Sequence, residues 1–316
     1  MRRSVTSALS AALVLTLWST AAAPAAQRDA SGRTIAVADA SRIVSIGGAV
    51  TEILYALGQG DRLVAVDATS LYPPEALKSK PNVGYFRQLS PEGVMSLSPS
   101  VILAVEGAGP KDAVSVLQSA SIPLVSIPDK YNGEGIVEKI RMISAAVGAE
   151  REGECLSRLV SDDLSALASL RAKINAPVRV IFILSFVNGR PMVAGRGTAA
   201  DGLIRMAGAV NAFDNFEGYK IINDEAVLAV APDAVIGMQR AGMDLDARTV
   251  FAHAAFRETP AAKQKRFFAM DGLYMLGFGP RTARAARDLS RSLYPDKTFA
   301  ELPSEGRTDV AVPCKK

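Results

Sequence analysis

The chain has 316 residues, with 36 Lys and Arg against 32 Asp and Glu, and a formal net charge of +4. Removal of residues 1–26 takes away two arginines and leaves +2, which argues against a nucleic-acid binder, because such proteins need a dense basic face. One histidine and two cysteines leave a His-rich zinc site and a Ser-His-Asp triad without support.

Residues 1–26 have the three zones of a secretory signal peptide. Arginines form the charged zone, residues 8–18 are apolar but too short to span a bilayer, and an alanine-rich run offers small residues for cleavage. An uncleaved signal anchor is the alternative. We expect an exported, periplasmic protein whose residues 27–40, small and polar without periodicity, form a flexible leader.

Short apolar runs separated by helical patterns fill residues 41–148 and predict an N-terminal α/β lobe. The expected strands lie at 42–46, 62–66, 101–105 and 123–127. Their β-branched composition and the helices between them predict a mainly parallel sheet.

A long amphipathic pattern over residues 149–175 predicts a connecting helix that ends before Pro177. Residues 176–316 then form a C-terminal α/β lobe, with strands expected at 178–184, 234–238 and 266–270. The predicted fold class is therefore α/β, with two Rossmann-like lobes joined by a single long α-helix and a ligand cleft between the lobes.

Two further features bear on this organisation. Cys155 and Cys314 are the only thiols, and in an oxidising compartment an even pair favours one disulfide, with two unpaired cysteines as the alternative. Residues 90–105 also match residues 223–238 without a gap. Both segments run from a capping residue through a short helix and a proline into a strand, which supports two similar lobes.

Catalytic motifs are not found in the sequence. It contains no P-loop, G-x-S-x-G or H-E-x-x-H, and GRGTAADG at 195–202 lacks dinucleotide-binding spacing and predicts a turn with Thr198 as N-cap. Exported two-lobe proteins of this kind are more simply explained as ligand carriers. An exported enzyme of unknown reaction is the alternative from another class.

The carboxyl ends of strands would bring three further side chains to the cleft. Phe186 and Tyr274 would belong to an apolar wall, and Arg240 would supply a cation. The implied ligand is large, apolar and partly anionic.

Most of residues 41–295 resembles the periplasmic haem-binding proteins that serve haem ABC importers. The likeness is carried by RIVSIGGAV, VGYFRQLSPEG, MVAGRGTAADGLIRMAGAV and MDGLYMLGFGPRTARAA, in the expected order. It implies a monomeric, non-enzymatic carrier with haem as transported ligand and an ABC permease dimer with its ATPase as partner. Siderophore and cobalamin carriers share the architecture but not G-Y-x-R, and they are the alternative within the fold.

In this family the tyrosine of G-Y-x-R binds haem iron, and Tyr85 holds that position here. Phenolate is a hard oxygen donor that suits ferric iron. Arg87 would share a side with Tyr85 if the segment is extended, where its charge favours phenolate and can face a propionate. A half-buried tyrosine beside a surface arginine is the alternative.

The resemblance also assigns roles to three other residues. Tyr274 falls where the family places an aromatic near the ligand, with core packing as the alternative. Glu92 and Glu225, which match in the internal comparison, correspond to acids through which related carriers meet permease arginines. Charge complementing the helix macrodipole is the alternative for both acids.

Overall fold

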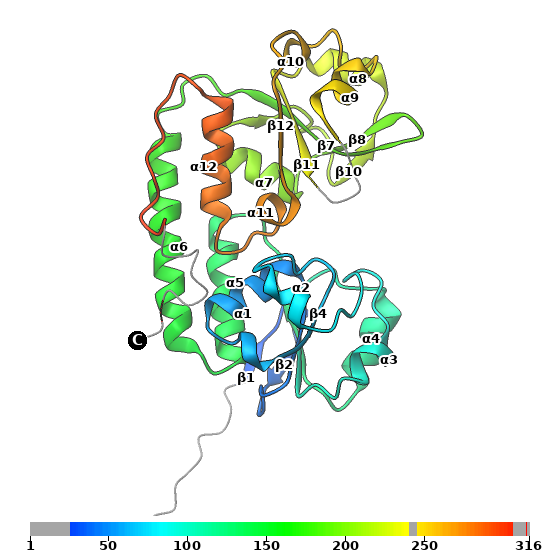
Figure 1. The fold of residues 1–316 in the computed structure, drawn as a ribbon, viewed down its shortest axis with the longest axis vertical. Coiled ribbons are helices and arrows are strands. Elements are labelled where there is room, and N and C mark those ends of the chain that lie inside the picture. The colour runs from blue at the N-terminus through cyan, green and yellow to red at the C-terminus, as the bar shows by residue number, and fades with distance from the viewer. Residues whose placement is uncertain (1–25, 240–244, 306–313, 315–316) are drawn as a thin grey trace, which may run out of the picture.

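A computed structural model describes residues 26–239, 245–305 and 314. Two β-sheets lie in separate lobes, and helix α6 (Glu150–Arg171) runs beside both (Figure 1). Among the described residues, no helix has the length and apolar character needed to cross a membrane.

The N-terminal lobe contains a four-stranded, wholly parallel sheet with the order β4-β3-β5-β6. Its strands are β3 (Ile43–Ile46), β4 (Leu63–Val66), β5 (Val101–Val105) and β6 (Leu124–Ile127). Each strand lies within a predicted one, because β-branched runs with helical crossovers specify a parallel sheet strongly. The surrounding helices are α1 (Gly48–Ala56), η1 (Gly60–Arg62), α2 (Glu75–Ser79), α3 (Pro91–Met95), α4 (Lys111–Ser119) and α5 (Gly133–Ala146).

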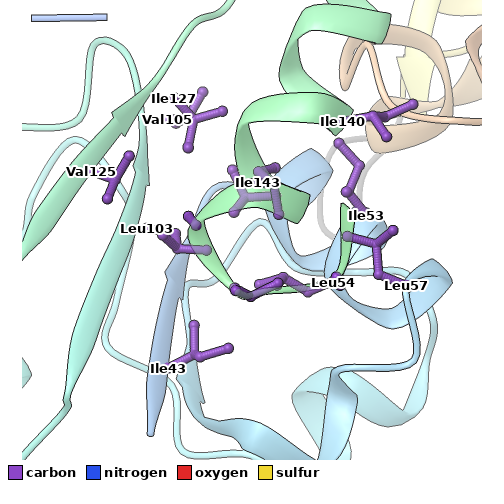
Figure 2. Close-up of a cluster of buried hydrophobic side chains, with 14 of the residues drawn as sticks. Ile43, Ile53, Leu54, Leu57, Leu103, Val105, Val125, Ile127, Ile140 and Ile143 are labelled. Carbon is purple, nitrogen blue, oxygen red and sulfur yellow. The ribbon is translucent and has the colours of Figure 1, made fainter. Parts of the chain in front are cut away.

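Aliphatic side chains fill the space between this sheet, α1 and α5 (Figure 2). They come from β3, β5, β6, α1 and α5, and the fully buried ones include Ile43, Leu103, Val125, Ile53, Leu54, Ile140 and Ile143. Each contributes about 1.5–3 kcal/mol through burial. This cluster fixes α5, and through it α6, against the sheet.

The C-terminal lobe contains a six-stranded mixed sheet with the order β10-β8-β7-β11-β12, and β9 also pairs with β7. The strands are β7 (Arg179–Val187), β8 (Arg190–Ala194), β9 (Val210–Asn211), β10 (Tyr219–Ile221), β11 (Ala234–Gln239) and β12 (Phe267–Asp271). Strands β7, β11 and β12 match the three predicted ones, whereas β8 and β10 are antiparallel and lie outside that prediction. Asn188 and Gly189, with φ of 50° and 74°, form the turn between β7 and β8.

Helices cover both faces of this second sheet. They are α7 (Ala199–Met206), α8 (Asp224–Val230), α9 (Ala247–Ala252), α10 (Pro260–Lys263), α11 (Gly272–Leu276) and α12 (Thr282–Leu293). Val180 and Phe182 of β7 pack with α7, α11 and α12, whereas Ile181 and Ile183 pack with α8, α9 and α10. This alternation is the two-residue period of a strand buried on both faces.

Helix α6 contributes to the cores of both lobes. Leu156 and Val160 belong to the N-terminal cluster, and Leu167 belongs to the C-terminal one. Twenty-two residues span about 33 Å at about 1.5 Å per residue, enough to pass along both lobes. The extents 41–148 and 176–316 remain predictions for the lobes themselves.

The segment predicted to be a flexible leader is partly structured, which corrects that expectation. Strands β1 (Ala26–Arg28) and β2 (Thr34–Ala36) form an antiparallel hairpin. The hairpin docks on edge strand β6: Ser126 N donates to Asp29 Oδ2 at 3.2 Å, and Arg33 Nη2 donates to Leu124 O at 2.9 Å. An edge strand offers unpaired backbone groups, and the hairpin satisfies some of them.

The turn between α11 and α12 inserts into the N-terminal lobe. Phe278 is fully buried within that lobe's core cluster, with its ring centroid 5.3 Å from that of Tyr131. The ammonium of buried Lys139 on α5 donates to Phe278 O at 3.3 Å and to Asp129 Oδ1 at 2.8 Å. A C-terminal-lobe side chain thus packs in the N-terminal core.

A buried ion pair crosses the same boundary. Arg281 donates to Glu52 on α1 through Nε to Oε1 and through Nη2 to Oε2, each at 3.0 Å. The side chains are only 13% and 5% exposed, and the Arg281 guanidinium also lies 3.5 Å from the centroid of the Tyr72 ring. This bidentate geometry compensates the desolvation of both charges.

The C-terminal segment is fastened along α6. Ser304 donates to Asp163 of α6 through its backbone N at 2.8 Å and through its hydroxyl, and Arg287 forms a bidentate pair with Glu305. A disulfide joins Cys155 to Cys314, the pairing that the sequence favours. Cys314 packs against the N-terminal cluster.

Replacing Cys155 by Ser should lower the free energy of unfolding by about 3–5 kcal/mol, because the cross-link constrains a long loop of the unfolded chain. Urea denaturation measures the loss. Wild-type protein treated with reductant should lose as much stability, and the same treatment should not affect the variant. Equal stability of oxidised wild type and variant would contradict the expectation.

Replacing Arg281 by Met should cost about 3–5 kcal/mol, because Glu52 is left buried without its partner. The control is Arg257→Met, since Arg257 pairs with Glu258 at 3.9 Å on the exposed surface and should cost no more than about 1 kcal/mol. Urea unfolding measures the free energy of unfolding of both variants. An equal decrease in the two would show that the buried pair stabilises the fold no more than the exposed pair.

Candidate functional site

Tyr85 lies on a tight turn held firmly by the N-terminal lobe. Gln88 N donates to Tyr85 O at 2.7 Å, and Gly109 N donates to Phe86 O at 2.9 Å. Gly84 takes a φ of 89°, which favours glycine at that position. The segment is therefore a turn and not the extended strand on which the alignment of Tyr85 with Arg87 depends.

The three side chains of this turn have different environments. Phe86 packs into the N-terminal core, with the Tyr85 ring edge-on at a centroid distance of 4.9 Å. The Arg87 guanidinium lies 4.9 Å from the centroid of the Phe86 ring, a cation–π contact. Tyr85 itself is 37% exposed, so its phenol is available to a ligand.

Arg87 acts electrostatically on two tyrosines besides its own turn. Desolvation raises the pKa of Tyr219 on β10, and the positive charge of Arg87 acts in the opposite direction. Tyr131 also has a raised pKa, chiefly from burial and from Asp129, and Arg87 again opposes the shift. Gly218 O accepts from Gly195 N at 2.7 Å just before α7, and Gly202 of α7 packs against Tyr131 of the N-terminal lobe, so Tyr219 lies near the boundary between the two lobes.

Tyr219 was missed by the sequence reasoning, although a signal for it exists. A Gly-Tyr pair stands before the capped helix in both lobes, at 84–85 and at 218–219. The gap-free internal comparison starts after both pairs, and one fewer residue separates the pair from the helix in the second lobe. A comparison that allowed one gap would have found it.

Tyr274 is half-buried and its hydroxyl is already engaged. The hydroxyl donates to Asp288 Oδ2 at 2.8 Å, and the ring lies 5.2 Å from the Arg281 guanidinium. Burial first, and then the Asp288 carboxylate, raise the pKa of Tyr274 well above its ordinary value. These contacts match the core-packing alternative, and contact with a ligand stays a prediction.

Phe186 and Tyr274 pack against different faces of the C-terminal sheet, and the contact of both with a ligand stays a prediction. Phe186 packs with the cluster beneath α8, α9 and α10, its ring 5.0 Å from that of His253, whereas Tyr274 packs on the opposite face. A shift of register between Ile183 and Ser185 changes the alternation of β7 just before Phe186. Arg240 lies outside the described residues.

Flexible apolar side chains do occupy the carboxyl ends of the parallel strands. Met238 of β11 and Met270 of β12 are register partners, and both are partly buried, as is Leu184 of β7. Methionine adapts its shape to irregular apolar surfaces. Contact of these side chains with a ligand stays a prediction.

Glu92 and Glu225 are both exposed in the first turn of a short helix. Ser90 caps α3 and donates to Glu92 Oε2 at 3.0 Å, while Asn223 caps α8 by accepting from Ala226 N. A backbone N–H and the Ser90 hydroxyl lower the pKa of Glu92. Both acids therefore complement a helix dipole and remain open to solvent.

Two other features bear on what can bind. Within the described ranges, no group of three or more His, Cys, Asp or Glu side chains is placed to hold a metal ion. A groove of about 920 Å³ lies between α5 and α6. It shares no lining residue with the turn of Tyr85, so it is separate from the candidate site.

Known proteins with similar sequences are transport proteins. The Bacillus subtilis (strain 168) protein "Uncharacterized ABC transporter substrate-binding lipoprotein YvrC" is 29% identical over 277 residues, covering 86% of each chain. A "Vitamin B12-binding protein" from Pectobacterium atrosepticum is 29% identical over 208 residues, covering 64% of this chain and 73% of the relative.

Among solved structures, the apo form of "Periplasmic heme-binding protein RhuT" from Roseiflexus sp. RS-1 is similar, with a TM-score of 0.76 and 35% identity. The similarity covers 81% of this chain and 99% of that chain. The model of the family described as "Periplasmic binding protein" matches residues 43–273, and the chain therefore belongs to the periplasmic binding protein family.

Proposed function

We propose that this protein captures ferric haem between its two lobes and delivers it to an ABC importer. The family is one of binding components of transport systems and not of enzymes. The observation that carries the proposal is Tyr85, an exposed phenol in a G-Y-x-R turn beside the inter-lobe space.

The chemistry of the turn suits ferric iron. A phenolate oxygen is a hard anionic donor, and tyrosine is an established axial ligand class for haem. The turn is held by backbone hydrogen bonds to residue 109, so the phenol needs little reordering on binding. Arg87 brings a positive charge to the same space, where it favours phenolate and attracts propionates.

The strand ends of the C-terminal lobe suit the rest of a porphyrin. Met238, Met270 and Leu184 offer apolar surface that is partly buried. A haem is large and flat, with two anionic edges, so apolar side chains together with one guanidinium complement it.

Delivery requires export and a membrane partner. Residues 1–26, which lie outside the described ranges, have the pattern of a signal peptide. Glu92 and Glu225 lie on corresponding helices of the two lobes, an arrangement suited to a permease dimer with basic residues on each half. We expect the carrier to be monomeric and to serve a permease dimer with its ATPase.

Cobalamin is the second candidate ligand, because the relative from Pectobacterium atrosepticum is named for vitamin B12 binding. Haem is favoured over it because the similar structure from Roseiflexus is named for heme binding at higher identity and coverage. Cobalamin also carries its own cobalt ligands and does not need an exposed phenol.

The first test is a titration with ferric haem. Wild type should bind one haem with a high-spin, tyrosinate-type visible spectrum, and Tyr85→Phe should lose that spectrum. Its affinity should fall by more than the roughly 10–100-fold that loss of a ligand's hydrogen-bond partner causes. Tyr55→Phe, on the partly buried face of α1, is the matched control and should behave as wild type.

The same titration also tests the alternative ligands. Cyanocobalamin and a ferric siderophore are titrated in parallel, and preferential binding of either would replace haem as the ligand. Absence of stoichiometric haem binding by wild type would end the proposal.

The second test separates capture from delivery. Replacing Glu92 and Glu225 by Arg should leave haem affinity unchanged but abolish haem transport into vesicles that contain the importer, because like charges then face each other. Each single change should reduce transport partly. Glu258→Arg reverses an exposed acid elsewhere and should transport normally. Full transport by the double variant would exclude this docking surface.

A further inference from the structure

The two lobes present tyrosines in corresponding positions. Gly84 and Gly218 take left-handed φ values of 89° and 75°, and each is followed by a tyrosine. A capped short helix with an acid in its first turn comes next in both lobes. Tyr219 thus occupies in the C-terminal lobe the position that Tyr85 occupies in the N-terminal lobe.

Exposure separates these two tyrosines from the other five. Tyr85 is 37% exposed and Tyr219 is 38% exposed, and the remaining tyrosines are all buried or partly buried. Each of these two rings is therefore partly accessible to a ligand on its own lobe. Tyr219 follows Gly218, which is bonded to Gly195 just before α7, and α7 packs against Tyr131 of the N-terminal lobe, so the open surface of Tyr219 borders the space between the lobes.

The local contacts of Tyr219 hold its ring and use its hydroxyl. The ring meets Phe182 edge-on, with centroids 6.5 Å apart. The phenol is hydrogen-bonded to Thr198, whose own hydroxyl donates to Gly195 O at 2.9 Å. The Thr198 hydroxyl lowers the pKa of Tyr219, but desolvation by burial outweighs it and leaves the pKa raised, so the phenol keeps its proton at neutral pH.

We propose that Tyr219 covers the second face of the bound haem, opposite Tyr85, as a neutral aromatic side chain and not as a second iron ligand. The inference rests on the proposed function and adds the C-terminal-lobe residue that meets the porphyrin. Tyr85 supplies the bond to iron, whereas Tyr219 supplies packing area. With one iron–phenolate bond, the carrier breaks a single covalent contact at delivery.

The test compares Tyr219→Ala and Tyr219→Phe in the full-length mature protein titrated with ferric haem. The Ala variant should raise the dissociation constant about tenfold or more, because it removes a packed aromatic surface. The Phe variant keeps the ring and should stay within about threefold of wild type. Both should retain the tyrosinate-type, five-coordinate spectrum.

Lys220→Ala is the matched control. It lies on the same edge strand with its side chain on the other face, where Nζ lies 4.9 Å from the centroid of the Phe216 ring. Its haem affinity should equal that of wild type. Urea unfolding of all three variants identifies any loss of fold, and if the Ala variant is unstable, Tyr219→Leu replaces it with the same expectation.

Two results would overturn the inference. Wild-type affinity in stable Tyr219→Ala or Tyr219→Leu would mean that this ring does not contact haem. Altered iron coordination in Tyr219→Phe, seen in the visible and electron paramagnetic resonance spectra, would make Tyr219 a ligand. Either result leaves the proposed function intact while Tyr85→Phe still abolishes tyrosinate ligation, whereas failure of wild type to bind haem refutes the proposed function itself.

Discussion

The insertion of the α11–α12 turn into the N-terminal lobe is the contact on which the rest of the arrangement depends. Phe278 of the C-terminal lobe packs in the core of the N-terminal lobe, Lys139 donates a hydrogen bond to the carbonyl group of Phe278, and Arg281 forms an ion pair with Glu52. Separating the lobes would expose an aromatic ring to water and would break the bidentate ion pair and the hydrogen bond of Lys139. The lobes are therefore held in one relative orientation by interactions that do not involve a ligand.

The fixed orientation of the two lobes explains how side chains from separate lobes can form one binding site. The turn of Tyr85 and the strand of Tyr219 belong to different lobes, and the packing of α7 against Tyr131 brings that strand to the boundary between them. Binding to such a prearranged surface loses little conformational entropy. The helix α6 and the covalently fastened C-terminal segment reinforce this orientation along the side of the molecule.

Sequence patterns predicted the elements that periodicity controls and missed those that depend on tertiary partners. Parallel strands and α6 were found because burial on both faces or on one stripe leaves a clear pattern. The β7–β8 hairpin was missed despite its Asn188-Gly189 signal, and the docked leader could not be seen because its partner, β6, is about ninety residues away in the chain. The register shift between Ile183 and Ser185 likewise depends on the partner strand β8 and leaves no mark in the composition.

The disulfide between Cys155 and Cys314 has a consequence for the order of events in the life of the chain. In a reducing cytosol both thiols stay free, so a precursor there would lack the cross-link and the stability that it adds. Cys314 lies 159 residues after Cys155 in the chain, so the disulfide can form only once the end of the chain has emerged. For the exported carrier proposed above, the precursor is thus the form more easily kept unfolded for passage through a translocation channel, and the mature fold is secured only on the oxidising side.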